Sequence, residues 1–257
     1  MTTTRPFQPS LDNLDVRQDA SLDDFSSLGY TPIITAINAL FQGQLQELYI
    51  IGDKGVGKTH LAMAITDKYT AQGKTVICVS LIDMINSDDG SSALMGLESF
   101  DLIILDDVGA VGASAEWQEA LFHLINRIRK DHKQMIFLAD NSARELGISL
   151  LDLLTRLSLA PAMRLPSGDE LSDRQAVLQS ILRRKNWRLP DEIFEYLLYH
   201  GPYKASDIMA VLSQITPLLK HLSRVQVPKK TMQEIKHIID DQTLLLEIGE
   251  YMNEIDE

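Results

Sequence analysis

The chain has 257 residues, a hydrophobic content of 45% and a formal net charge of −12 at pH 7. This length allows one large domain or two small ones with a sizeable core, and the negative charge argues against a protein that coats DNA or RNA. A single cysteine, Cys78, excludes a disulfide framework, and no apolar leader or run of 18 apolar residues occurs, so we expect a cytoplasmic protein without a membrane partner.

The first segment, residues 1–27, is polar and contains Pro6, Pro9 and many Asp and Ser residues. This composition is typical of a flexible tail. The stretch Gln8–Leu14 lies inside it, and on its residues alone it is equally compatible with a plain linker.

A glycine-rich loop follows the apolar run Leu48–Ile51 and precedes a helical pattern. The loop reads GDKGVGKT and matches the P-loop pattern G-x-x-x-x-G-K-[ST] in its strand–loop–helix context, for which a chance glycine-rich turn is the alternative. Glycines let backbone N–H groups converge on a phosphate, and the helix N-terminus favours the same anion. We therefore expect ADP or ATP to bind here, with Lys58 on the β- and γ-phosphates and the Thr59 hydroxyl on Mg²⁺. The expected nucleotide-binding residues are Gly52, Gly55, Val56, Gly57, Lys58, Thr59 and His60.

Two carboxylates end the apolar run Leu102–Leu105, which is the Walker B pattern. Parallel strands deliver their last side chains to the carboxyl edge of a sheet, where the P-loop also opens. We expect Asp106 to hold the Mg²⁺ shell and Asp107 to lie near the attacking water.

Another buried strand is predicted at Gln134–Ala139, and the polar residues Asp140, Asn141 and Ser142 follow it. A polar side chain at this tip could orient the lytic water or cap the next short helix, and both roles are compatible. Farther along, Arg156 is the only basic residue of the apolar segment Leu150–Leu159. From the residues alone, such an arginine is more typical of a packed surface side chain than of a catalytic group.

Strand patterns cease at about Ser167, and helical periodicity takes over. The sequence thus predicts three parts: a tail at 1–27, an αβα nucleotide-binding domain with a parallel sheet at 28–166, and a small all-helical domain at 167–257. Helices are predicted at Leu171–Trp187, Pro190–His200, Ala205–Leu219 and Thr231–Tyr251.

Five blocks taken together resemble one family over roughly residues 20 to 240. They are GDKGVGKTHL, LIILDDVGAV, the helix segment Leu121–Asn126, FLADNSARELG, and LLTRLSL followed by helices with WRLPDEI. The resemblance is to the AAA+ module of the bacterial initiator DnaA, and it implies a three-layer αβα domain followed by a helical lid. The chain stops where the DNA-binding domain of the initiator would begin, and it lacks the long N-terminal domains, as in the Hda-like regulators of DnaA.

The resemblance implies further roles for single residues. Asp140 would be the sensor at the strand tip, and Arg156 the arginine finger that reaches a nucleotide in a neighbouring subunit. The second-sensor arginine of the family falls here near Ser206, so Lys204, two positions earlier, is the candidate replacement. The segment Gln8–Leu14 occupies the place of the peptide that binds the sliding clamp, although it has Pro9 and lacks an aromatic end.

The function that the resemblance implies is negative regulation of replication initiation. The protein would promote ATP hydrolysis on DnaA together with the sliding clamp, with at most a weak ATPase activity of its own and little direct nucleic-acid binding. The resting nucleotide and homo-oligomerisation are left open. The alternatives are a DnaC-like replicative helicase loader, which would need affinity for single-stranded DNA, and a non-enzymatic adaptor.

Overall fold

The computed structural model describes residues 20–87, 90–168, 170–185, 187–220 and 227–255. They divide between two compact units. The first contains the chain up to Leu22, Ala36–Ile51 and Thr59–Ala162, and the second contains Asp23–Thr35, Gly52–Lys58 and the chain from Met163 onward. The P-loop residues 52–58 are therefore grouped with the C-terminal helices, whereas a boundary after Pro166 would leave them with the sheet.

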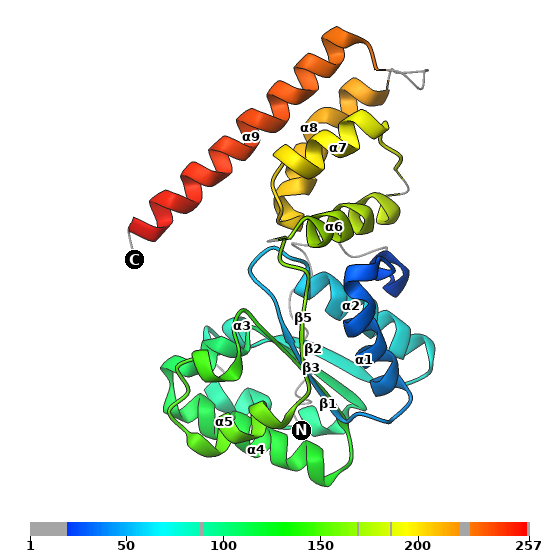
Figure 1. Cartoon of the computed structure of the whole chain (residues 1–257). Helices are drawn as coiled ribbons and strands as arrows, with labels where there is room; N and C mark the ends of the chain where they lie inside the picture. Colours follow the sequence, from blue (N-terminus) through cyan, green and yellow to red (C-terminus); the bar gives the residue numbers. More distant parts are fainter. Residues whose placement is uncertain (1–19, 88–89, 169, 186, 221–226, 256–257) are drawn as a thin grey trace, which may run out of the picture. The chain divides into compact units, whose positions relative to one another are not determined.

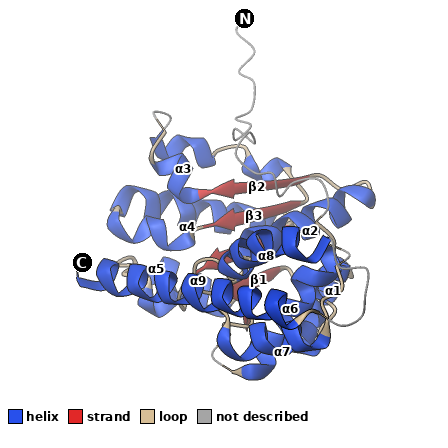
Figure 2. Ribbon diagram, turned by 90° about the horizontal axis from the view of Figure 1, so that it is seen from above, coloured by secondary structure: helices blue, strands red, loops and turns tan. Residues whose placement is uncertain are grey.

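The sheet has five strands in the order β2-β3-β4-β1-β5, and its strands β1 to β4 organise the first unit. The strands β1, β3 and β4 consist entirely of buried residues, which suits strands covered on both faces. The neighbouring pairs β1–β4, β2–β3 and β3–β4 are parallel, and Figure 2 shows β2 and β3 pointing the same way. The predicted parallel α/β sheet is confirmed. The strands are β1 (Glu47–Ile51), β2 (Val76–Ser80), β3 (Leu102–Asp106), β4 (Gln134–Ala139) and β5 (Ala162–Arg164).

Helices cover both faces of this sheet. The helix α2 (Lys58–Ala71) and the second half of α1 (Thr31–Phe41) lie on one face, and α4 (Ala115–Lys130) and α5 (Leu151–Leu159) lie on the other (Figure 1). Alternate strand residues such as Ile103 and Phe137 pack with α4 and α5 in one buried cluster. Shorter helices connect these elements: α3 (Leu81–Ile85), η4 (Gly90–Leu94), η5 (Leu97–Ser99), η6 (Val108–Ala113) and η7 (Ala143–Glu145).

Four helices form most of the second unit, and the predicted helical lid is confirmed. They are α6 (Leu171–Arg184), α7 (Asp191–His200), α8 (Ala205–Lys220) and α9 (Lys229–Ile255). The first half of α9 packs against α7 and α8 through its buried residues Met232, Ile235 and Ile239, and its second half runs on beyond them (Figure 1).

In the described residues, helical structure begins at Leu22, inside the segment 1–27 that is predicted to be a flexible tail. Residues 1–19, including Gln8–Leu14, lie outside the described part, but η2 (Leu22–Phe25) and η3 (Leu28–Tyr30) are helical. Phe25 and Tyr30 are both 2% exposed and meet edge to face at 5.1 Å, and the Ser27 hydroxyl donates to the Ala176 carbonyl at 3.4 Å. The tail prediction is therefore wrong for residues 22–27, because two aromatic rings anchor this segment to the second unit. Within the described ranges, no helix is long and apolar enough to cross a membrane.

Candidate nucleotide-binding site

A hydroxyl and a carboxylate meet at the carboxyl edge of the sheet in the first unit. Thr59 lies in the first turn of α2, and Asp106 is the last residue of β3. The Thr59 Oγ1 donates to Asp106 Oδ2 at 2.8 Å, and Asp106 is 6% exposed. These hard oxygen atoms are the ligand type that Mg²⁺ prefers in proteins. The structure therefore brings together the two residues that the sequence predicts as metal ligands.

Asp107 has an unusual backbone conformation, with φ 56° and ψ 44°. Its N–H donates to Asp106 Oδ1 at 2.9 Å, and its carboxylate accepts a hydrogen bond of 3.1 Å from the Ser80 hydroxyl. Left-handed backbone is costly for a residue with a Cβ and is found mostly where the surroundings impose it. Ser80 was not among the predicted site residues. The feature that could have identified Ser80 is its position, because it is the last residue of β2 and aligns with Asp106 in the sheet.

Asp140 follows the neighbouring strand β4. Because Leu105 aligns with Phe137, Asp140 lies just past Asp106 at the same edge of the sheet. The next residues are held firmly: the Tyr49 hydroxyl donates to the Asn141 carbonyl at 2.9 Å, and Ser142 and Glu145 form a capping box. The cap predicted for the short helix is thus present at Ser142, and a sensor role for Asp140 stays a prediction.

The acidic edge also affects Cys78 on β2. Burial raises the pKa of its thiol to about 12, with smaller contributions from the Asp106 and Asp107 carboxylates. The negative charge of the two carboxylates therefore contributes to the electrostatic potential at Cys78 inside the sheet. A bound cation would offset it, which is consistent with the ligand chemistry of Thr59 and Asp106.

The P-loop is built within the second unit. Gly55 has φ +82° and Gly57 has φ +104°, conformations that residues with side chains rarely adopt. The Lys58 ammonium, which is 7% exposed as a residue, donates to the carbonyls of Gly52 at 2.6 Å and Asp53 at 3.1 Å. The loop therefore has the backbone freedom and the buried cation that a polyphosphate requires.

The same loop contacts the start of α8. The Ser206 N–H donates to the Gly55 carbonyl at 3.3 Å, and a Cβ built on Gly55 would lie 2.7 Å from Ser206 Oγ and 3.7 Å from Lys204 Cβ. Lys204 thus lies beside the loop as its predicted role requires, and that role stays a prediction. Val56 is buried in the loop, and His60 follows Thr59 in the first turn of α2.

Within the first unit, Arg156 lies apart from Thr59 and Asp106. Its carbonyl accepts a hydrogen bond of 3.1 Å from Arg129 Nη2, and Arg129 is ion-paired with Glu47. Glu47 is the first residue of β1, whereas Asp106 is the last residue of β3, and both strands run parallel to β4. The backbone of Arg156 is therefore tied to the amino edge of the sheet, opposite the edge that carries Asp106.

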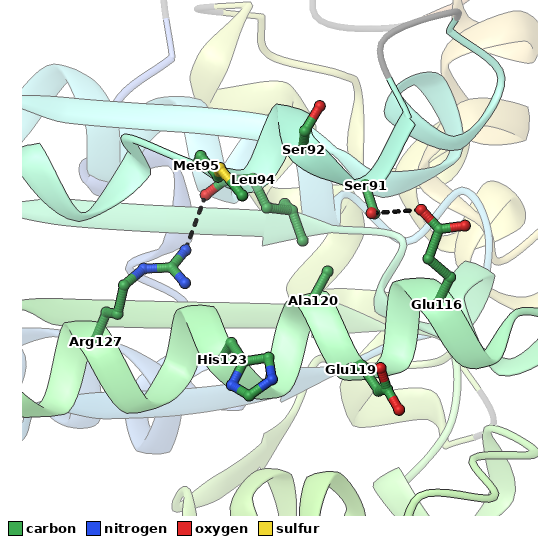
Figure 3. A pocket seen from close by; sticks show the side chains of 9 residues that line it. All are labelled: Ser91, Ser92, Leu94, Met95, Glu116, Glu119, Ala120, His123 and Arg127. Carbon is green, nitrogen blue, oxygen red and sulfur yellow. Dashed lines mark hydrogen bonds between the residues drawn. The ribbon is translucent and has the colours of Figure 1, made fainter.

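A hollow in the first unit involves none of the predicted site residues. It has a volume of about 300 Å³ and lies between η4 and α4 (Figure 3). Across it the Ser91 hydroxyl donates to Glu116 at 2.6 Å, and Arg127 donates to the Leu94 carbonyl at 3.4 Å. His123 also lines it, so this part of the Leu121–Asn126 segment faces a hollow that is separate from the predicted nucleotide ligands.

Comparisons with known proteins give the family and the fold that this chain resembles. The family described as IstB-like ATP binding protein matches residues 7–156. An uncharacterized protein of Haemophilus influenzae is 34% identical over 170 residues, which is 63% of this chain and 71% of that protein.

Two solved structures are similar in fold. Domain III of the replication initiation protein DnaA from Thermotoga maritima has a TM-score of 0.68 and 17% identity, over 86% of this chain and 97% of that one. AMPPCP-bound DnaA from Aquifex aeolicus has a TM-score of 0.63 and 24% identity, over 77% of this chain and 65% of that one. At these identities the likeness establishes a common fold.

Proposed function

Because the chain belongs to the family of IstB-like ATP binding proteins, we propose that it binds ATP or ADP at its P-loop and acts on a second ATPase. In this proposal the second ATPase is the replication initiator DnaA, and Arg156 promotes hydrolysis of the ATP that DnaA holds. Initiation of replication would thereby be switched off, with the DNA-loaded sliding clamp as a further partner.

The residues present fit a magnesium nucleotide. Each unit supplies its own part of this chemistry. In the second unit, the glycines of the loop leave its backbone open to phosphate oxygens and Lys58 supplies a cation. In the first unit, Thr59 and Asp106 supply a hydrogen-bonded pair of metal ligands. When bound, the nucleotide supplies the phosphate chain that these groups neutralise. Asp107 and Asp140 lie at the same sheet edge as Asp106 and are the groups proposed to orient water.

The observation that carries the proposal is the distance between Arg156 and this edge. Glu47 and Ile103 both align with Met135, so Glu47 lies level with a residue three positions before Asp106. Three residues of strand span about 10 Å, and two steps across the sheet add nearly as much sideways. Since the carbonyl of Arg156 is bonded beyond Glu47, its side chain is poorly placed for the Asp106 site of its own chain. An arginine finger acting on a partner is the role that suits this position.

The exposed face of α5 also favours contact with another protein. Leu151 is 73% exposed and Leu159 is 63% exposed, and they flank Arg156 at the two ends of the helix. Large exposed apolar side chains next to a functional group are typical of an interaction surface. The DnaA protein of Aquifex aeolicus binds AMPPCP, so a DnaA-type partner can hold the nucleotide that such an arginine would reach.

The direct test compares the wild type with Arg156→Ala in the hydrolysis of ATP bound to DnaA, with clamp loaded on DNA. We expect the variant to lose the stimulation by a factor of about 10³ or more while retaining its own nucleotide affinity. Equal stimulation by the two proteins would refute the proposal. If the wild type gives no stimulation but binds single-stranded DNA tightly at physiological salt, the helicase-loader alternative takes its place.

The clamp contact is tested separately, because Gln8–Leu14 lies outside the described residues. A pull-down with the sliding clamp should recover the wild type and fail with the double variant Gln8→Ala, Leu11→Ala. Replacing the nearby Thr3 and Thr4 by alanine supplies a matched control in the same segment. Equal recovery of all three proteins would remove the clamp from the proposal and leave the role of Arg156 untouched.

A further inference from the structure

We propose that Gln118 and Arg129, two side chains of α4, are positioning residues that fix the two ends of α5 and so determine how Arg156 is presented. This inference rests on the proposed function of Arg156. All the elements involved belong to the first unit.

Gln118 holds the beginning of α5. It is 1% exposed, and its Oε1 accepts hydrogen bonds from Ser149 N at 3.0 Å, Ser149 Oγ at 3.1 Å and Leu150 N at 2.9 Å. Leu150 is the N-cap of α5 and has no side chain that could accept a hydrogen bond from the first turn. A buried amide on another helix therefore fixes the backbone just where α5 begins.

The other end of the same amide reaches the segment after Walker B. Gln118 Nε2 donates to the carbonyls of Val111 at 3.3 Å and Gly112 at 3.0 Å, both in η6, which directly follows Asp107. A Cβ built on Gly112 would lie 2.2 Å from the Leu146 carbonyl oxygen, so this segment and the chain leading to α5 touch backbone to backbone. Gln118 thus joins the start of α5 to the segment that follows the Walker B carboxylates Asp106 and Asp107.

Arg129 holds the end of α5. Its guanidinium makes two hydrogen bonds to Glu47, through Nε to Oε1 and through Nη2 to Oε2 at 2.7 Å, and the same Nη2 donates to the Arg156 carbonyl at 3.1 Å. The helix turns tightly here, since the Ala160 N–H bonds the Leu157 carbonyl. The Arg156 carbonyl is therefore one of the last-turn acceptors that need a partner from outside the helix.

The spacing of the two residues matches the helix that they hold. Gln118 and Arg129 are eleven residues apart, which is three turns plus about 20°, so they project from the same face of α4 about 16 Å apart. A nine-residue helix such as α5 is about 13 Å long and is too short to be stable on its own. Its position is therefore set from outside, by the core packing of Leu153 and Leu157 and by the buried Gln118 and partly buried Arg129 contacts at its two ends.

The test uses the full chain in the DnaA hydrolysis assay, with Arg129→Met and Gln118→Leu as the variants. We expect each variant to lower the maximal stimulated rate about tenfold or more, at an unchanged half-saturating concentration and an unchanged affinity for its own ATP. Arg129→Lys should fall in between, because one ammonium group can pair with Glu47 but cannot also reproduce the planar fork. Combining either variant with Arg156→Ala should add no further loss.

Tyr69→Phe is the matched control for lost stability. It removes a hydroxyl that is bonded to Gln134 within the buried part of the first unit, on α2, across the sheet from α5. This control should lower the melting temperature and leave the stimulated rate within twofold of the wild type. If the α4 variants behave in the same way, their role is structural only and the proposal is wrong.

Amide hydrogen exchange of residues 151–159 separates this inference from the function on which it rests. We expect faster exchange of α5 in Arg129→Met and Gln118→Leu, and wild-type exchange in Tyr69→Phe. Unchanged exchange in both α4 variants would overturn the proposal whatever Arg156 does. By contrast, a wild-type stimulated rate in Arg156→Ala would overturn the proposed function itself.

Discussion

The Ser80 hydroxyl donates a hydrogen bond of 3.1 Å to the Asp107 carboxylate, from the strand that lies next to the Walker B strand. The bond directs Asp107 toward β2 while its backbone is held in a left-handed conformation. In the proposed function, in which Asp107 orients the attacking water, Ser80 would compete with that water for the Asp107 oxygen atoms.

If ATP is hydrolysed as proposed, replacing Ser80 by alanine should raise the intrinsic ATPase rate by about tenfold or more, because a hydrogen bond to a charged carboxylate is worth about 1.5 kcal/mol or more. Single-turnover hydrolysis with bound ATP measures the effect. Ser80→Thr keeps the hydroxyl and should behave as the wild type. Since Ser80 also caps α3 by accepting from Asp83 N at 3.3 Å, the alanine variant should melt slightly earlier. A rate as low as that of Asp107→Asn would instead make Ser80 a group that orients Asp107 productively.

Replacing Thr59 by valine keeps the shape of the side chain and removes the hydroxyl that bonds Asp106. ATP should then bind with nearly the same affinity in EDTA, while the additional affinity conferred by Mg²⁺ should fall about tenfold. Titration of a fluorescent ATP analogue with and without Mg²⁺ measures both values. Thr59→Ser retains the hydroxyl and is the control. Magnesium dependence that is identical in the valine variant and the wild type would exclude Thr59 as a metal ligand.

Replacing Gly55 by alanine should damage the P-loop more than backbone strain alone explains. Gly43 has a similar φ of +73° with nothing within 4 Å of a built Cβ, whereas at Gly55 the added Cβ would lie 2.7 Å from Ser206 Oγ. Gly43→Ala should therefore cost about 1 kcal/mol of unfolding free energy, and Gly55→Ala should cost more and also weaken nucleotide binding. Urea unfolding and ATP titration compare the two. Rescue of Gly55→Ala by Ser206→Gly would identify the clash as the cause, and equal effects at both glycines would exclude it.

Replacing Asp101 by asparagine should destabilise the protein in a pH-dependent way. A hydrogen bond from Lys133 and two from Thr75 hold the pKa of the Asp101 carboxyl well below its usual range. A folded-state pKa that is lowered contributes stability above the unfolded pKa of about 3.9, and this stability is lost as the pH falls toward the folded value. The variant should thus be less stable than the wild type at pH 7 and nearly equal to it in strong acid. The difference at pH 7 should stay within about 1 kcal/mol, because the pair is partly exposed.

Urea unfolding at pH 7, pH 2.5 and pH 1 measures this difference, which should shrink at each step because the lowered folded pKa keeps part of the carboxylate ionised at pH 2.5. Asp152→Asn, on the exposed side of α5, changes the same charge and should show little effect at either pH. A loss of stability for Asp101→Asn that is as large in acid as at neutral pH would show that the ionised carboxylate is not its source.

Local patterns predicted much of the fold and part of the site. Continuous apolar runs at Leu102–Leu105 and Gln134–Ala139 predicted buried strands, and the structure has strands there because only residues apolar on both faces can lie inside a covered parallel sheet. The glycine spacing before Lys58 predicted a loop of special backbone, and Gly55 and Gly57 have the positive φ values that such a loop requires. Each of these predictions depends on residues that are close together in the chain.

Residues whose partners are far away in the sequence were not predictable in this way. Gln118 bonds Ser149 and Leu150 across 31 and 32 residues, and Arg129 bonds Glu47 across 82. Their type alone indicates only a polar side chain on an amphipathic helix. Likewise Phe25 lies in a polar stretch that resembles a tail, and it packs against Tyr30, whose helix η3 contacts the distant helix α6.

The sequence by itself determined the chemistry at the end of β1, because the eight-residue motif that follows this strand contains a cation, a hydroxyl and glycine backbone close together. Only the tertiary structure decided that Arg156 lies toward the opposite edge from Asp106, because the register of three parallel strands and two contacts from α4 set that separation. A local motif depends on residues that are neighbours in the chain, whereas the distance between two sites depends on how segments far apart in the sequence pack together.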